Sequence, residues 1–233
     1  MGLYWLNRGM MLFNVIRNIL RPKEPQQLVA VPAESATPRV LNVGGGSKQI
    51  PIPTWYRGWE HLLLDIDPLT GADIVLDARQ LDTLPGALFD SVYCSHNLEH
   101  YYRHDVAKVL AGFSHVLKSD GFAEIHVPDM QQVMQHCVAN GNDIHSILYE
   151  SAAGPITVHD VMYGWGKQIA SSGVDFYAHK TGFTPSSLRA VLLEAGFAEV
   201  RINPPAKDFA IAALAFKQVP SASQRALLKS AFA

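Results

Sequence analysis

The stretch RVLNVGGG, residues 39–46, decides the fold of this 233-residue chain. A short apolar run that ends in consecutive glycines is typical of a buried parallel strand followed by a tight turn. Further apolar runs, each ending in polar or turn-forming residues, lie at residues 60–66, 73–76, 89–94 and 122–127. The sequence therefore predicts buried strands whose carboxyl ends carry the unusual residues.

Helical patterns and a closing strand pair complete the fold prediction. Apolar residues recur at spacings of three and four from Val106 to Leu117, which predicts an amphipathic helix. A second helix is expected to begin at Thr184-Pro185 and to end at Gly196. Residues 198–202 and 209–216 read as two strands joined without a helix, which indicates antiparallel pairing. We predict an α/β fold: a Rossmann-like doubly wound sheet, mostly parallel, with one antiparallel edge strand.

The chain is expected to divide into three parts. Residues 1–38 hold an N-terminal amphipathic helix and a Pro-rich linker, residues 39–218 the main domain, and residues 219–233 a C-terminal tail. The helix within residues 1–20 fits packing on the domain or on a second subunit, and the alternative is a cationic amphipathic helix on a membrane surface. A homodimer and a weak membrane-surface contact are both left open.

Composition excludes several classes of protein. Lys and Arg number 19 and Asp and Glu 21, so the formal net charge is -2 and no basic excess faces a nucleic acid backbone. The two cysteines, Cys94 and Cys137, exclude a disulfide scaffold. No apolar run is long enough to span a bilayer. We expect a soluble cytoplasmic protein that does not bind nucleic acid.

The strand ends carry the candidate site. The carboxyl ends of strands in a doubly wound sheet meet at one edge, where ligands bind. Glycines after the first strand let a ligand approach the backbone closely, because no Cβ intervenes. Asp65, about twenty residues further on, is placed to accept both hydroxyls of a ribose. The remaining unusual residues at these ends are Asp77, Ser95, His96 and Asp129. This pattern predicts a nucleoside cofactor.

Five ordered motifs resemble a known family. They are VLNVGGG (residues 40–46), LDIDP (64–68), LDA (76–78), FDSVYCSHNLEH (89–100) and VLKSDG (116–121). Together they resemble the class I S-adenosylmethionine-dependent methyltransferases. Within this family the chain looks like the small methyltransferase-domain proteins often found beside genes for saccharide and cell-surface polymer synthesis. The resemblance covers residues 39–130 through these motifs and residues 183–217 through the order of the elements.

The resemblance implies a role for each matching residue in binding S-adenosylmethionine. Gly44, Gly45 and Gly46 would line its methionine half. Asp65 would hold the ribose and Ile66 would pack on the adenine. The adenine amino group would meet Asp77 with the backbone of Ala78, and Ser95 and His96 would lie near the sulfonium. Two departures are Asn42 in place of an acid and Lys48 in place of a third glycine, where it can meet the methionine carboxylate.

Three residues near the expected methyl group are candidates for the base that removes a proton from the acceptor. His96 and His100 flank the predicted site, and Asp129 follows the fifth strand at the same edge. The alternative for His100 is a packing role at the start of the following helix. His96, His100 and His104 also recur at helical spacing beside Glu99, but the Cys pairs common in closed zinc sites are missing, so we predict no metal.

Residues 140–182 are expected to form an insertion over the acceptor site. Its aromatic and polar residues suit a sugar or another hydroxylated ring, and the candidates are His159, Tyr163, Trp165, His179 and Lys180. The alternative is a surface loop or a dimer contact whose aromatic residues simply pack.

The function predicted from these observations is methyl transfer from S-adenosylmethionine to an oxygen of a small molecule or saccharide. A non-catalytic S-adenosylmethionine-binding module is the first alternative. The second is an NAD-dependent dehydrogenase, since Tyr163 and Lys167 match a Tyr-x-x-x-Lys spacing. That pair needs a continuous helix, and Gly164 and Gly166 between them disfavour one by about 1 kcal/mol each.

Overall fold

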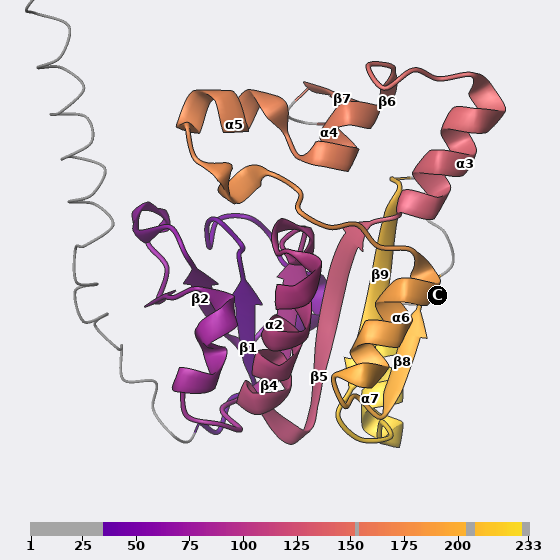
Figure 1. Ribbon diagram of the computed structural model, residues 1–233. Coiled ribbons are helices and arrows are strands. Elements are labelled where there is room, and N and C mark those ends of the chain that lie inside the picture. Colours follow the sequence, from indigo (N-terminus) through magenta and orange to yellow (C-terminus); the bar gives the residue numbers. More distant parts are fainter. Residues whose placement is uncertain (1–34, 152–153, 204–207, 230–233) are drawn as a thin grey trace, which may run out of the picture.

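A seven-stranded sheet forms the centre of the molecule in the computed structural model, which describes residues 35–151, 154–203 and 208–229. The strand order is β3-β2-β1-β4-β5-β9-β8 (Figure 1). The bounds are β1 Arg39–Val43, β2 Glu60–Asp65, β3 Ile74–Val75, β4 Phe89–Ser95, β5 Leu117–Pro128, β8 Glu199–Ile202 and β9 Ala210–Phe216. The expected helix within residues 1–20 lies outside the described residues.

Pairing within the sheet confirms the predicted fold class. The strands β3, β2, β1, β4 and β5 run parallel to one another, whereas β9 is antiparallel to both β5 and β8. The reversed strand therefore lies one place in from the edge, which β8 forms. The reason is that β8 and β9 are joined without a crossover helix, so the pair enters the sheet with β9 against β5.

The order of strands also fixes where a ligand binds. Strand β1 pairs on one side with β2 and on the other with β4, so the chain reverses its direction of progress across the sheet at β1. In open α/β sheets the crevice outside the carboxyl ends at such a point is the usual ligand site. Val43 lies opposite Leu64 in the register, so the glycines after β1 and Asp65 at the end of β2 are neighbours.

Two helices cover one face of the sheet. They are α2 (Arg103–Val116) and α6 (Pro185–Glu194). Their apolar faces pack on the strands in a cluster that includes Leu41, Leu64, Val92, Ile125, Val109, Phe113, Leu188 and Leu192. The predicted cap at Thr184 is present, with a capping box to Ser187 and proline at the first helical turn. A second cluster, which includes Val40, Tyr56, Phe122, Phe216 and Leu228, packs on the opposite face under η1 (Thr54–Tyr56) and α7 (Ala222–Leu228).

One boundary differs from the sequence prediction. We expected Leu117 on the helix and a strand that begins at residue 122, but β5 begins at Leu117. Leu117 takes extended backbone angles directly after α2 and pairs with Phe89, so the chain passes from helix to strand without a loop. Lys118 then donates to the carboxylate of Asp90 at 2.9 Å, which fastens this early start of β5 to β4.

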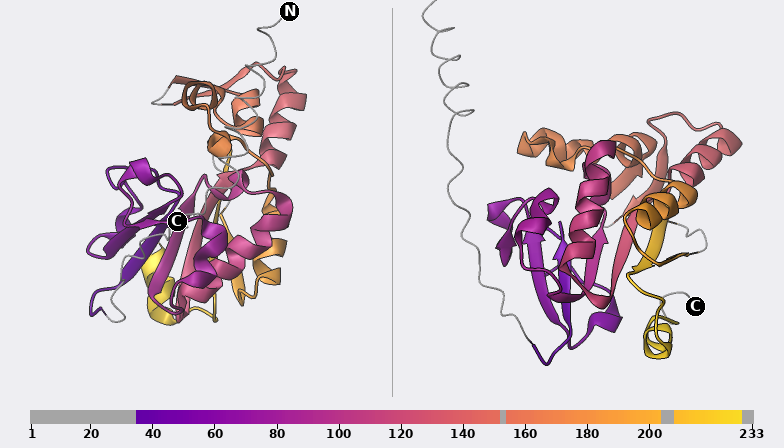
Figure 2. Two further views of the ribbon diagram at one scale, coloured as in Figure 1. Left: turned by 60° about the vertical axis from the view of Figure 1, so that its left-hand side comes forward. Right: turned by 60° about the horizontal axis from the view of Figure 1, so that its bottom comes forward.

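A small cap lies beyond the carboxyl ends of the strands, as the views in Figure 2 show. It consists of α3 (Met130–Asn140), the hairpin β6 (Ile147–Ser151) and β7 (Gly154–Thr157), α4 (Val158–Tyr163), α5 (Gly166–Ser172) and the short turn η5 (Asp175–Tyr177). Val133, Val158, Val161 and Phe209 give it a core of its own. Among the described residues, no helix combines the length and apolar character needed to cross a membrane.

Candidate active site

The glycine loop after β1 requires glycine for two separate reasons. Gly44 has φ +70°, and a Cβ added there would overlap the side-chain amide of Asn97. Its N–H donates to the carbonyl of Leu64 at 2.8 Å, which holds the loop against β2. A Cβ at Gly45 would overlap the buried amide of Asn42 in turn. The loop therefore presents bare backbone to the crevice, and Asn42 supports it from below.

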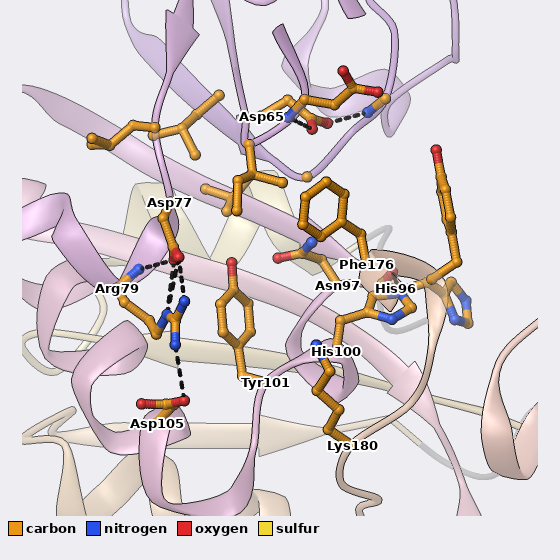
Figure 3. Close-up of a pocket in the computed structure, with 18 of the residues that line it drawn as sticks. Asp65, Asp77, Arg79, His96, Asn97, His100, Tyr101, Asp105, Phe176 and Lys180 are labelled. Atoms are coloured by element: carbon orange, nitrogen blue, oxygen red, sulfur yellow. Dashed lines mark hydrogen bonds and ion pairs between the residues drawn. The ribbon is translucent and has the colours of Figure 1, made fainter. Parts of the chain in front are cut away.

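Asp65 closes the loop from the neighbouring strand. Its carboxylate is 8% exposed, and it accepts hydrogen bonds from the backbone N–H of Gly46 and of Asp67, both at 3.0 Å (Figure 3). The two bonds go to different oxygens, so each oxygen keeps acceptor capacity for a hydroxyl. Ile66, which is partly exposed, lies next to it on the wall of the same cavity. This arrangement suits a ribose diol beside an adenine ring.

A cavity of about 390 Å³ runs from this loop to the cap. The ends of β1, β2 and β4, the start of α2 and the turn η5 line it. The residues that matter for its chemistry are Gly44, Gly46, Asp65, Ile66, Asp77, Arg79, His96, Asn97, His100, Tyr101, Asp105, Asp175, Phe176, Tyr177 and Lys180.

Arg79 closes one end of the cavity in a way that the sequence analysis missed. Its guanidinium forms an ion pair with Asp77 at 2.6 Å and a second with Asp105 at 3.2 Å (Figure 3). The hydrogen bonds to Asp77 raise the pKa of Arg79 above its ordinary value. Asp77 does lie on the cavity wall as expected, but Arg79 already engages both of its oxygens. Ala78 is buried beneath this pair and does not line the cavity.

His96 opens onto the cavity with a buried carboxylate behind it. The residue has φ +49°, a rare value for a side chain with a Cβ, and its N–H donates to the carbonyl of His126 at 2.9 Å. Its Nδ1 lies 3.4 Å from Oε1 of Glu99, whose side chain is only 1% exposed. Burial opposes protonation of His96, but Glu99 outweighs it, and the pKa of His96 lies above its ordinary value. The imidazole is thus placed to take up a proton.

The other two candidate bases have different surroundings. His100 lines the cavity, with Nδ1 3.1 Å from the carbonyl oxygen of Ala178 and Nε2 3.1 Å from that of His96. Asp129 does not line it. Its carboxylate is buried and caps helix α3, accepting from the N–H groups of Gln131 and Gln132 at 3.0 and 3.1 Å. The structure therefore gives Asp129 a capping role in place of the expected base role.

Three further expectations on the cofactor side need correction. Gly45 and Ser95 are not among the residues that line the cavity, because Gly45 packs on Asn42 and Ser95 is still part of β4. Lys48 forms an ion pair with Asp73 at 2.6 Å and does not line the cavity. Its ammonium is therefore engaged away from the expected methionine carboxylate.

On the acceptor side, the cap contributes different residues from those expected. Of the five candidates, Lys180 alone lines the cavity, and η5 adds Asp175, Phe176 and Tyr177. His159 and Tyr163 pack on each other, and Trp165 precedes α5. His179 is mostly buried beneath His100, with ring centroids 5.0 Å apart. Adjacent aromatic residues at 176 and 177 were the signal that could have identified η5.

Tyr163 and Lys167 do not lie on the continuous helix that the dehydrogenase alternative needs. Helix α4 ends at Tyr163, Gly164 has φ +95°, and α5 begins at Gly166. Tyr163 and Lys167 therefore belong to separate helices, and neither lines the cavity.

Comparisons with known proteins bear on the fold and on the domain that carries this site. Residues 41–125 match a family model described as a methyltransferase domain. No curated protein sequence matches the chain. A solved S-adenosylmethionine-dependent methyltransferase from Archaeoglobus fulgidus is 17% identical, with 90% of this chain and 94% of that chain covered and a TM-score of 0.51.

Two further solved structures share the fold. The PH0226 protein from Pyrococcus horikoshii OT3 is 11% identical, with 93% of this chain and 92% of that chain covered and a TM-score of 0.50. The CurJ carbon methyltransferase is 12% identical, with 90% and 54% covered and a TM-score of 0.51. The segment matched by the family model carries the glycine loop, Asp65, Asp77 and His96. Residues 41–125 therefore carry a methyltransferase domain, the fold is that of a solved S-adenosylmethionine-dependent methyltransferase, and these findings support S-adenosylmethionine as the cofactor.

Proposed function

We propose that the protein methylates a hydroxyl oxygen of a small hydroxylated molecule, with saccharides as the substrate class. The observation that carries this proposal is His96: an imidazole half-exposed to the cofactor cavity and backed by the buried carboxylate of Glu99. An alcohol must lose its proton as it is methylated, whereas many other acceptors need no base.

The cradle fits S-adenosylmethionine on two observations. Gly44 and Gly46 line the cavity without side chains, and Asp65 keeps acceptor capacity on both carboxylate oxygens. When bound, S-adenosylmethionine supplies an electrophilic methyl group. Asp65 and the glycine loop hold the cofactor, and Arg79 with Asp77 closes the cavity at one end. These residues position the cofactor and leave the acceptor to the cap side.

His96 removes the acceptor proton in this proposal. Its Nδ1 faces Glu99, so the tautomer with hydrogen on Nδ1 leaves the Nε2 lone pair for the acceptor hydroxyl. The negative charge of Glu99 stabilises the imidazolium that forms, which agrees with the raised pKa of His96.

The lining of the cap side supports a small polar ring as the acceptor. Phe176 and Tyr177 offer aromatic faces for the C–H groups of a sugar, and Asp175 and Lys180 offer hydrogen bonds to its hydroxyls. These residues of the cap line the same cavity of about 390 Å³ as the glycine loop, so an acceptor held by them would lie next to the cofactor. We place the protein in the cytoplasm, where Cys94 and Cys137 stay reduced.

The test incubates the tag-free full chain with isotope-labelled S-adenosylmethionine and a panel of monosaccharides, nucleotide sugars, amines and carboxylic acids. We expect a methyl ether on a sugar, detected by mass spectrometry. His96→Ala should lower kcat/KM by about 10²–10⁴ with unchanged S-adenosylhomocysteine affinity, while His104→Ala is the control. Labelled methyl on nitrogen or carbon would contradict O-methylation. Cofactor binding with no labelled product from any hydroxylated compound would favour the non-catalytic alternative.

A further inference from the structure

One carboxylate and two imidazoles meet beneath the cavity. One ligand atom from each of Glu99, His100 and His179 lies within 4.8 Å of the other two. The helical spacing in the sequence points instead to His96, His100 and His104. His104 is 79% exposed and lies beside Asp105, whereas the cap delivers His179 from far along the chain.

We call these three residues the Glu99–His100–His179 cluster. Glu99 is its unusual member. Its side chain is 1% exposed, and neither carboxylate oxygen has a hydrogen-bond partner among the described residues. A buried carboxylate without hydrogen bonds is costly, so such groups are normally paired with a cation or coordinate a metal. The nearest basic atoms are imidazole nitrogens: His96 Nδ1 at 3.4 Å and His179 Nε2 at 3.9 Å from Oε1.

The tautomer of His179 is fixed by its other nitrogen. Nδ1 lies 2.9 Å from the carbonyl oxygen of Val161, which only accepts, so Nδ1 carries the hydrogen. Nε2 then presents its lone pair toward Oε1 of Glu99 at 3.9 Å. Two lone-pair atoms at that separation make no hydrogen bond, but ligands that each lie about 2.0–2.2 Å from one ion are roughly 3–4 Å apart. A backbone carbonyl on the second ring nitrogen is the usual support for a metal-binding histidine.

His100 has a surplus of acceptors around its ring. Each nitrogen lies 3.1 Å from a carbonyl oxygen, that of Ala178 or that of His96. A neutral imidazole has one N–H, so it satisfies one carbonyl and leaves the second nitrogen with a lone pair. That lone pair lets His100 serve as a ligand in the cluster.

Backbone contacts hold the three ligand residues in register. The carbonyl of Glu99 accepts from the N–H groups of Lys180 at 2.8 Å and Thr181 at 3.1 Å, so the chain segment that carries His179 is fixed to the turn that carries Glu99. The N–H of His179 donates to Tyr163 at 3.0 Å. Ligands positioned by backbone hydrogen bonds need little reorganisation when an ion binds.

We propose that Glu99, His100 and His179 bind a divalent transition-metal ion, with an open coordination position toward the cavity. Two imidazoles favour Zn²⁺, Co²⁺ or a similar ion over Mg²⁺ and Ca²⁺, which take oxygen ligands. An acceptor hydroxyl bound at the open position would have a lowered pKa and would lose its proton more easily. This catalytic role rests on the proposed function, whereas binding of the ion does not.

The experiment measures metal affinity directly. Tag-free full-length protein is dialysed against a chelator, and Co²⁺ is then titrated while its visible absorption is recorded, with Zn²⁺ as the competitor. We expect one Co²⁺ per chain, displaced by Zn²⁺. Glu99→Gln and His179→Asn should each weaken binding at least about tenfold, and His104→Asn should bind as the original protein does. Thermal unfolding and S-adenosylhomocysteine binding of the metal-free variants show whether they fold.

The possible results separate this inference from the proposed function. Absence of stoichiometric Co²⁺ binding, or unchanged binding by folded Glu99→Gln, would overturn the metal site. An imidazolium at His100 in the metal-free protein, seen by nitrogen NMR together with no ion uptake, would show that a protonated histidine balances Glu99 instead. If the protein methylates sugars but takes up no ion, only the metal inference fails. If it binds the ion and methylates no hydroxyl, only the proposed function fails.

Discussion

The carboxylate of Asp65 accepts a hydrogen bond from the backbone N–H of Gly46 at 3.0 Å, although the two residues belong to the ends of different strands. The same carboxylate faces the cofactor cavity. One side chain therefore both shapes the glycine loop and faces the proposed cofactor site, so a change at Asp65 should affect the two together.

Asp65→Asn should weaken binding of S-adenosylhomocysteine by about 10- to 100-fold. The amide replaces one acceptor oxygen with a donor that faces a backbone N–H or a ribose hydroxyl, and a hydrogen bond to a charged group contributes about 1.5–3 kcal/mol. Isothermal titration calorimetry measures the change. Asp82→Asn, an exposed site with the same change of charge, is the control and should keep the original affinity. Equal affinity for the two variants would remove Asp65 from the binding site.

Gly44→Ala should destabilise the fold more than Gly141→Ala. The two glycines have similar φ angles, +70° and +63°, but a Cβ meets Asn97 at position 44 and open space at position 141. The shared cost of the left-handed backbone is about 1–2 kcal/mol. Urea unfolding of both variants isolates the additional cost of the overlap at Gly44, and only Gly44→Ala should also lose S-adenosylhomocysteine affinity. Equal destabilisation would indicate that Asn97 moves aside freely.

Lys48→Met should leave S-adenosylhomocysteine affinity within about threefold of the original, because an exposed ion pair contributes at most about 1 kcal/mol. The ammonium is paired with Asp73 at 2.6 Å and does not line the cavity. Calorimetry at low and high salt checks this. A loss as large as that of Asp65→Asn would revive the contact between Lys48 and the methionine carboxylate.

Asp129→Asn should retain activity, while Asp129→Ala should mainly lose stability. Asparagine caps a helix about as well as aspartate, whereas alanine in its place costs about 0.5–2 kcal/mol. The carboxylate accepts from the N–H groups of Gln131 and Gln132, which begin α3. Rates of methyl transfer and urea midpoints of both variants distinguish capping from catalysis. An inactive but stable Asp129→Asn would return Asp129 to the role of base.

Stability should decline on mild acidification in part through His61. Burial and the charge of Lys48 lower the pKa of His61, so the folded chain takes up this proton at lower pH than the unfolded chain does. The contribution to the free energy of unfolding is therefore complete above about pH 6.5 and is lost as the pH falls through the lower folded pKa. Urea unfolding from pH 8 to pH 5 should show a shallower decline for His61→Gln, and His104→Gln should follow the original protein.

Local patterns predicted the part of the site that lies close in sequence to the strand ends. The run before Gly44 gave β1, and the position of Asp65 after the next run placed it beside the loop, because neighbouring parallel strands end at one edge. Residues that reach the cavity from other elements were harder to predict from the sequence. Arg79 projects from a short turn toward α2, and η5 brings Phe176 over the cavity from the cap.

The sequence pattern indicated His104 as the third member of the histidine cluster, whereas the structure brings His179 there, again because that residue comes from another element. Helical spacing suggested His104, but the residues after His100 do not continue as a helix, since α2 begins only at Arg103. A contact between Glu99 and His179 depends on how the cap folds back, and no periodicity within either segment reports that path.

The two hydrogen bonds from the N–H groups of Lys180 and Thr181 to the carbonyl of Glu99 restrict how the cap can move away from the cavity. These bonds attach the cap to the turn that carries Glu99, so the cap cannot move away from the sheet as a rigid body about residues 180–181 without breaking both bonds. Exchange of cofactor and product therefore has to proceed with these two hydrogen bonds intact or has to break them, so backbone contacts outside the reacting atoms bear on how the site is entered.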